Sequence, residues 1–269
     1  MQYLHMPAAV AGNTVSEVSQ GADVSGFQAF LNDVWQKFES TFIVEERWRL
    51  FADGLLKTVQ ITIFAALLGV ALGFLVAMVR STHDLTAHQS RGKTLGRAVL
   101  NIFNFICNLY ITVIRGTPVV IQLLIMYNII FANSRNAVLI AILSFGINSG
   151  AYVAEIVRSG IMSIDKGQFE ASRSIGFDYK STMLYVIMPQ ALKNILPALG
   201  NEFIVLVKET SVAGYVAIMD LTKVGNTIIS RTYDAFFPLI SVAIFYLIVV
   251  LILSFFLKKL ERRLRNSDH

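Results

Sequence analysis

Residues 165–176 read DKGQFEASRSIG, a polar stretch that stands between two strongly apolar segments. Asp165 can cap a helix and Gly176 can end one, so the stretch predicts a short surface helix of about two to three turns. A second polar turn, residues 178–182, leads into residues 183–189 and the next apolar segment. This pattern indicates a surface element that is recognised from outside the apolar part of the molecule.

Composition places the chain among membrane proteins. Its 269 residues are 55% hydrophobic and 15% charged, with a mean hydropathy of +0.59, whereas soluble domains carry roughly 25% charged residues. Runs of about 20 apolar residues can cross the hydrocarbon as helices. We therefore predict an all-helical integral membrane protein with spans near residues 55–79, 117–131, 137–157, 184–207 and 236–257.

The segment from Arg97 to Phe131 is too long for one upright span, since it would measure about 50 Å as a helix. The sequence RGTP at residues 115–118 weakens the helix near its middle. We therefore expect residues 97–114 to form an interfacial or tilted approach helix. The bend from Arg115 to Pro118 would then open the second span.

Charge distribution orients the chain. Basic residues dominate the loop after the first span and the C-terminal tail, which places both in the cytoplasm. The first 53 residues are acidic overall and can lie outside. Five spans satisfy these placements, with the N-terminus outside and the C-terminus in the cytoplasm.

The polar stretch also carries a motif. Glu170-Ala171-Ser172, Gly176 and the VIMP sequence at residues 186–189 resemble, in spacing, the E-A-A…G…I-x-L-P loop of ATP-binding-cassette (ABC) importer permeases. Ser172, Val186 and Met188 depart from that pattern by small changes. The sequences RGTP with Gln122, YVAEIVR at 152–158 and KETS at 208–211 resemble the polar amino-acid branch of the family. The resemblance covers roughly residues 50–265, and residues 1–50 have no recognised counterpart.

The resemblance implies a type I importer (MetI-like) permease fold over residues 51–265, with a cytoplasmic coupling loop at residues 165–189. It implies a bacterial cytoplasmic membrane and translocation of a polar amino acid by alternating access. The implied partners are a second permease, identical or related, two cytoplasmic ATPase subunits and an external amino-acid-binding protein. The coupling residues would be Glu170, Ala171, Ser172, Arg173 and Gly176. The alternative is an ordinary solvated loop, in which its apolar residues would be wasteful.

The chain has no phosphate-binding sequence of the G-x-x-x-x-G-K-[ST] type. We therefore expect it to hold no cofactor and to have no enzymatic activity of its own, with ATP and magnesium bound by the partner ATPases. The four histidines lie in the termini or the first cytoplasmic loop, so no metal site is expected. The net charge of +5 is concentrated in the cytoplasmic loop and tail, so topology explains it without nucleic acid.

Glu202 is the main candidate for binding substrate, because an ionisable residue with apolar sequence on both sides is costly inside a membrane. It would bind the α-ammonium or a basic side chain, so basic amino acids, glutamine and histidine all remain open as cargo. The alternative is a structural ion pair with Arg115 or with Lys208 of the partner subunit. Gln122, Asn128 and Ser149 could line the same path, although helix-to-helix hydrogen bonds are the more common role of such residues. Asp220 is an outer candidate that equally suits a helix cap.

Residues 27–51 mix aromatic and charged side chains. They predict either an amphipathic helix on the outer surface or a loose extension. Two other classes of protein compete with the importer. A secondary transporter would show an internal repeat with two broken helices, which is not found, and a membrane anchor or receptor would leave Glu202 and the coupling-type loop unexplained.

Overall fold

The computed structural model describes residues 11–86 and 95–265, and every regular element within them is a helix. In chain order these are α1 (Ala11–Phe42), η1 (Val44–Glu46), α2 (Trp48–Thr86), α3 (Leu95–Arg115), α4 (Val119–Ile125), η2 (Met126–Ile130), α5 (Ala137–Met162), α6 (Lys166–Ser174), α7 (Tyr179–Ser181), η3 (Thr182–Ile187), α8 (Met188–Glu209), η4 (Thr210–Val216), α9 (Leu221–Thr232) and α10 (Phe236–Arg265). Of the short elements, η2 and η3 are π-helical turns, and η1 and η4 are 3₁₀ helices.

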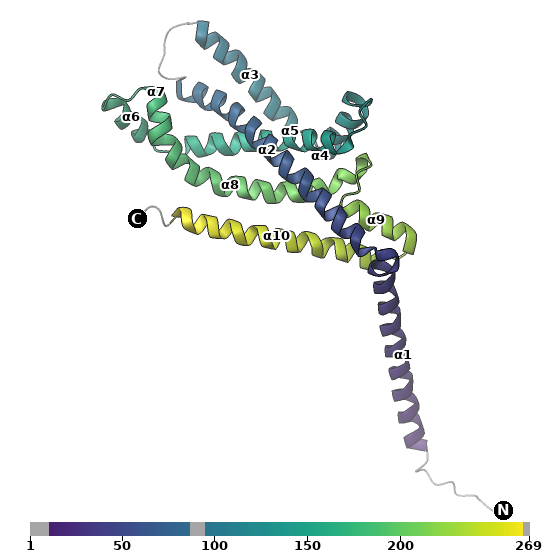
Figure 1. The fold of residues 1–269 in the computed structure, drawn as a ribbon. Helices are drawn as coiled ribbons and strands as arrows, with labels where there is room; N and C mark the ends of the chain where they lie inside the picture. Colours follow the sequence, from purple (N-terminus) through teal and green to yellow (C-terminus); the bar gives the residue numbers. More distant parts are fainter. Residues whose placement is uncertain (1–10, 87–94, 266–269) are drawn as a thin grey trace, which may run out of the picture.

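The long helices form a bundle whose two ends differ. Helices α6 and α7 lie at one end, α9 lies at the other, and α1 projects away from the α9 end (Figure 1). A helix satisfies its own backbone hydrogen bonds, which hydrocarbon requires of any span. The predicted all-helical architecture is therefore confirmed.

Helices α2 and α5 form the central pair of the bundle. A Cβ atom placed on Gly69 of α2 would lie 3.0 Å from Ser149 Cβ of α5, and one on Gly73 would overlap Val153. Small residues at such positions let two helix backbones approach closely, and dispersion contacts between them then hold the pair. The pair thus provides a tightly packed surface on which the other helices assemble.

Helix α8 packs beside this pair. Its buried residues Ala191 and Ile195 form one apolar cluster with Val153, Val157 and Ile161 of α5. Pro189 stands in the first turn of α8, where its missing N–H is tolerated. The helix continues through Pro197 to Glu209.

Threonine hydroxyls join the elements at the α9 end of the bundle. Thr62 Oγ1 lies 3.2 Å from Thr210 Oγ1, and both side chains are buried. The backbone N–H of Leu221 donates to Thr58 Oγ1 over 3.3 Å. These bonds join α2 to the end of α8 and the start of α9 in a buried region, where an unpaired hydroxyl would be costly.

By length and composition, four helices of the described residues can cross a membrane. They are Val44–Leu85, Leu95–Arg115, Ala137–Met162 and Phe236–Leu264. Helix α8, at 22 residues, has the length to cross as well, but it is more polar.

The prediction for residues 97–131 was wrong. Residues 97–114, expected to be an approach helix, belong to α3, which is itself a candidate span. Residues 117–131, expected to cross, contain only the seven residues of α4 and the five of η2, which reach about 18 Å. The bend does lie at Gly116 to Pro118, as predicted. The apolar helix that is long enough to cross a membrane is α3, which ends before this bend.

The glycine contact predicts the effect of a single methyl group. Gly73→Ala should lower the melting temperature of the purified chain in detergent, because overpacking of this kind costs about 1–3 kcal/mol. The matched control is Gly96→Ala, since a Cβ at Gly96 meets nothing within 4 Å. If the two variants melted alike, the close α2–α5 contact would be refuted.

Candidate functional site

Glu202 lies within α8 and faces α5. Its Oε1 accepts a hydrogen bond of 2.9 Å from Ser149 Oγ, and Ser149 is buried. The two side chains line a pocket of about 230 Å³ between α2, α5 and α8. The other lining residues are apolar: Ala66, Val70, Val153, Leu199, Gly200, Phe203 and Leu206. Glu202 is partly buried, and a carboxylate lined mainly by apolar side chains attracts a cation more strongly than one in open water, because less solvent screens it.

Arg115 is the cation within this chain proposed as a structural partner for Glu202, but its guanidinium contacts a different residue. Its guanidinium stands over the ring of Tyr152, 5.1 Å from the ring centroid. Among the described residues, Glu202 forms no ion pair with Arg115 or with any other cation. Ser149 is therefore the polar partner that this chain provides.

Gln122 holds the bend between α3 and α4. Its Nε2 donates to the carbonyl oxygen of Ile114 over 2.7 Å and to Thr117 Oγ1 over 2.8 Å. Its Oε1 accepts from Asn148 Nδ2 over 3.0 Å. With these partners Gln122 connects α3, α4 and α5, and it does not line the pocket at Glu202.

The two remaining candidates for substrate binding are also separate from that pocket. Asn128 Nδ2 donates to the carbonyl oxygen of Leu124 over 2.9 Å within its own short helix. Asp220 is fully buried and caps α9, where its carboxylate accepts from the backbone N–H groups of Thr222 and Lys223, each over 3.2 Å. Burial raises the pKa of Asp220, and these N–H groups oppose the shift. Of the predicted set, the structure brings together Ser149 and Glu202.

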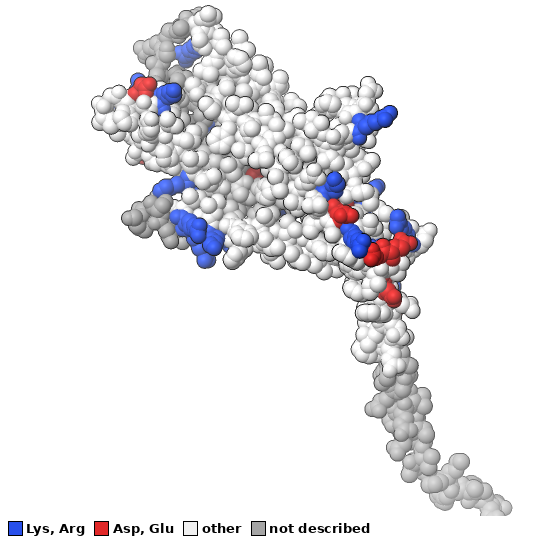
Figure 2. All heavy atoms as spheres, viewed as in Figure 1, with Lys and Arg blue, Asp and Glu red and all other residues white. Residues whose placement is uncertain are grey.

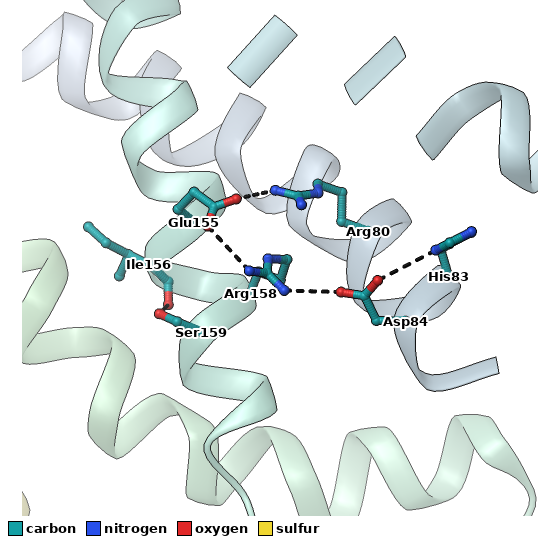
Figure 3. Close-up of polar contacts among 7 residues, drawn as sticks. All are labelled: Arg80, His83, Asp84, Glu155, Ile156, Arg158 and Ser159. Atoms are coloured by element: carbon teal, nitrogen blue, oxygen red, sulfur yellow. Dashed lines mark hydrogen bonds and ion pairs between the residues drawn. The ribbon is translucent and has the colours of Figure 1, made fainter. Parts of the chain in front are cut away.

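Sequence reasoning missed a network of ion pairs between α2 and α5. Glu155 accepts from Arg80 and, over 3.4 Å, from Arg158. Arg158 also binds Asp84 over 3.1 Å, and Asp84 lies 3.5 Å from His83 Nδ1 (Figure 3). A sequence signal existed, because residues 80 and 84, and residues 155 and 158, each share one face of a helix. What the sequence could not show was that the two faces meet.

The coupling-type stretch forms α6, with the predicted start and end. Asp165 accepts from the backbone N–H of Gly167 over 2.6 Å. Gly176 has φ +95°, a left-handed conformation that glycine adopts without strain. The N–H of Phe177 then donates back to the carbonyl oxygen of Ser172 over 3.1 Å. This arrangement stops the helix and turns the chain toward α7.

The residues of α6 divide into two faces. Ser172 is buried, and Phe169 packs on the apolar cluster that α5 and α8 share. Glu170, Ala171, Arg173 and Gly176 are exposed, as are Phe177 and Ile175, the last with 75% of its surface accessible. One face therefore holds α6 on the bundle, and the other is open.

The apolar helices form a bundle with a carboxylate pocket, and a short helix is exposed at one end. This is the architecture of a membrane permease. The chain matches the family described as binding-protein-dependent transport system inner membrane component over residues 91–266. It belongs to this family, and the resemblance to amino-acid ABC importer permeases is confirmed. The chain is thus a transport subunit of an inner-membrane ABC importer, which sets aside the secondary transporter and the receptor.

Relatives of known description are similar over most of their length. A putative glutamine transport system permease protein of Rickettsia typhi (strain ATCC VR-144 / Wilmington) is 35% identical over 215 residues, covering 79% of this chain and 91% of its own. The glutamine transport system permease protein of Escherichia coli (strain K12) is 35% identical over 215 residues, covering 78% and 93%.

Solved structures agree with the fold. A structure described as an amino acid ABC transporter with histidines matches with a TM-score of 0.71 and 38% identity, over 82% of this chain and 96% of that one. An inward-facing methionine ABC transporter matches with a TM-score of 0.67 over 81% and 97%. At 20% identity, the second supports the fold alone.

The ion network predicts a charge-swap rescue. Arg158→Asp and Asp84→Arg should each lower the melting temperature, since either leaves like charges facing one another in a half-buried site. The double variant should recover part of the loss, as a double-mutant cycle would measure, because it restores the pair between positions 84 and 158 but not the pair of residue 158 with Glu155. Lys37→Asp with Asp33→Lys, an exposed pair on α1, is the control with little effect. Additive losses in the double variant at positions 84 and 158 would contradict the pairing.

Proposed function

We propose that this chain carries a polar amino acid inward by alternating access and that Glu202 binds the α-ammonium group of the substrate. The observation that carries the proposal is the Glu202 carboxylate, hydrogen-bonded to Ser149 in an otherwise apolar pocket. Glutamine is the first cargo to test, because the similar permeases are described as glutamine transporters. Histidine and basic amino acids follow, since every one of these substrates has the same ammonium group.

The proposed topology has five spans: α2, α3, α5, α8 and α10. The N-terminus lies outside and the C-terminus in the cytoplasm. Lys and Arg side chains gather at the C-terminal end of α10 (Figure 2), where Lys258, Lys259, Arg262 and Arg263 lie, as the positive-inside rule requires of a cytoplasmic end. With α3 as the second span, the polar loop after α2 is also cytoplasmic and α6 lies on the same side.

Helix α6 is the proposed coupling helix, with its open face seated on a cytoplasmic ATPase. Ile175 and Phe177 would enter an apolar cleft, and Glu170 and Arg173 would pair with charges at its rim. Two contacts support the transfer of motion into the membrane. Phe169 reaches the apolar cluster of α5 and α8, and Asn194 of α8 donates to Ser163 Oγ just before α6 over 3.0 Å.

The remaining parts of the proposed complex come from partners. Two ATPase subunits bind ATP and magnesium, and an external binding protein delivers the amino acid to the α9 end of the bundle. A second permease, either another copy or a related chain, completes the path. Purification of the chain with a bound ATPase tests this composition directly.

The substrate site predicts a defect from an isosteric change. Glu202→Gln should reduce uptake by the assembled importer in proteoliposomes by about tenfold or more, because a charge-assisted hydrogen bond contributes roughly 1.5–3 kcal/mol. Glu202→Asp should retain part of the activity, and Ser149→Ala should show a smaller loss. The control is Glu209→Gln, which neutralises a carboxylate of the same helix outside the pocket. Unchanged transport of every amino acid by Glu202→Gln would refute the proposal.

The coupling surface predicts a defect in assembly. Glu170→Lys and Gly176→Val should reduce the amount of ATPase that copurifies with the permease, the first by charge and the second by straining a residue at φ +95°. Ser174→Ala is the control, because Ser174 Oγ bonds to its own helix at the carbonyl oxygen of Glu170 over 2.9 Å. If both variants assembled and transported like the wild type, α6 would not be the coupling helix.

A further inference from the structure

Helix α1 carries an unpartnered aromatic face. At about 100° per residue, the large apolar residues between positions 27 and 42 lie within an arc of about 140°, and polar residues occupy the opposite side. The apolar side comprises Phe27, Phe30, Leu31, Val34, Trp35, Phe38 and Phe42, and the polar side includes Asn32, Gln36, Glu39 and Ser40. Phe27, Phe30 and Trp35 are 62%, 61% and 59% exposed. A contiguous apolar surface of this kind marks a site of contact.

The same side of α1 is buried where the helix reaches the bundle. Thr41 is fully buried, and a series of aromatic rings runs from α1 through α2 to α10. Its members are Trp35, Phe38, Phe42, Phe51 and Phe245, with neighbouring ring centroids 5.1–5.8 Å apart. Phe245 lies well inside α10, so the aromatic side of α1 faces the apolar depth of the bundle and not the surface beyond α9.

The corner between α1 and α2 fixes this orientation. Glu45 and Glu46 adopt φ of 54° and 51°, a conformation that only surrounding contacts can maintain in such residues. The buried Arg47 donates to the carbonyl oxygen of Ser40 over 2.6 Å, and Arg231 of α9 binds Glu45 over 3.2 Å. As a result, α1 runs crosswise to α10 at the α9 end (Figure 1).

We infer that residues 27–42 of α1 lie along the membrane surface, with the aromatic face in lipid at the boundary of headgroups and acyl chains. Through Phe42 and Phe51 this face reaches Phe245 of α10, and Ile248 and Ile252 on the same side of α10 are exposed. What covers that side of α10 therefore also covers α1. Aromatic side chains are the residues that such interfaces favour.

The proposed contact between α1 and lipid is apolar and not electrostatic. The segment carries Asp33, Lys37 and Glu39, a net charge of 1 − 2 = −1, so anionic lipid has no basic cluster to bind. Zwitterionic phosphatidylcholine should therefore suffice, and salt should not weaken the contact. The proposed topology places residues 27–42 at the outer leaflet. The contact with lipid itself does not depend on that topology.

The two tryptophans of the chain, Trp35 and Trp48, both lie in this region. With Trp48→Phe, Trp35 becomes the sole indole of the full chain, which is placed in phosphatidylcholine nanodiscs containing lipids spin-labelled on the acyl chain. We expect strong quenching of Trp35, greatest with labels near the headgroup. Combining Trp35→Gln with Gln36→Trp moves the indole by about 100° and should reduce quenching about twofold or more.

Other outcomes would overturn the inference. Weak quenching at both positions would mean that water covers the face, and blue-shifted emission without quenching would mean that protein covers it. A second pair keeps the test independent of the aromatic series: Leu31→Cys and Asn32→Cys, each in a Cys107→Ser background and labelled with an environment-sensitive dye, should differ in the same way. Reaction of Asn32→Cys with an impermeant thiol reagent from outside whole cells reports the leaflet separately, so a wrong topology is distinguishable from a wrong contact.

Discussion

The close contact between α2 and α5 is the constraint on which the rest of the structure depends. In lipid there is no gain from hiding apolar surface, so two helices associate through the shape of their contact and through polar groups that need each other. Here Gly69 and Gly73 admit α5, and Glu155 and Arg158 then meet Arg80 and Asp84. Helix α8 uses the surface so formed, which brings Glu202 to Ser149. The pocket lies where these three helices meet.

The order of the helices along the chain links the two ends of the molecule. Helix α5 continues through a three-residue link into α6, and α8 follows α6 after the short α7 and η3. If α6 is the coupling helix, as proposed, its displacement would reach helices on both sides of the Glu202 pocket. Because packed helices shift as units and resist bending, such a motion would change the pocket as a whole.

Much of the fold could be predicted from local patterns, and the errors arose where distant residues decide. Apolar length located three of the four candidate spans in the described residues. The Asp165 and Gly176 signals located α6, because caps and left-handed glycine act within one turn. The bend at Gly116 to Pro118 was also visible. The position of this bend relative to the membrane was not visible in the sequence, because it depends on the hydrogen bonds that Gln122 makes with Ile114 and Asn148. Likewise the sequence predicted only that Ser149 could line the same path as Glu202, 53 residues away. The packing of α5 on α8 is what brings the two side chains into a hydrogen bond.

The π-helical turn η3 affects how residues before and after it are oriented around the helix. A π-turn contains one residue more than an α-helical turn of the same span, and η3 stands between the coupling-type helix and α8. Removing that surplus residue would leave an α-helical turn of the same span, so the helical segments before and after it would keep their angular relation. Glu202 would then stay beside Ser149. The wide turn is thus a place where the chain between α6 and α8 can hold one residue more without rotating Glu202, whereas the same change in a regular turn of α8 would rotate all later residues by about 100°.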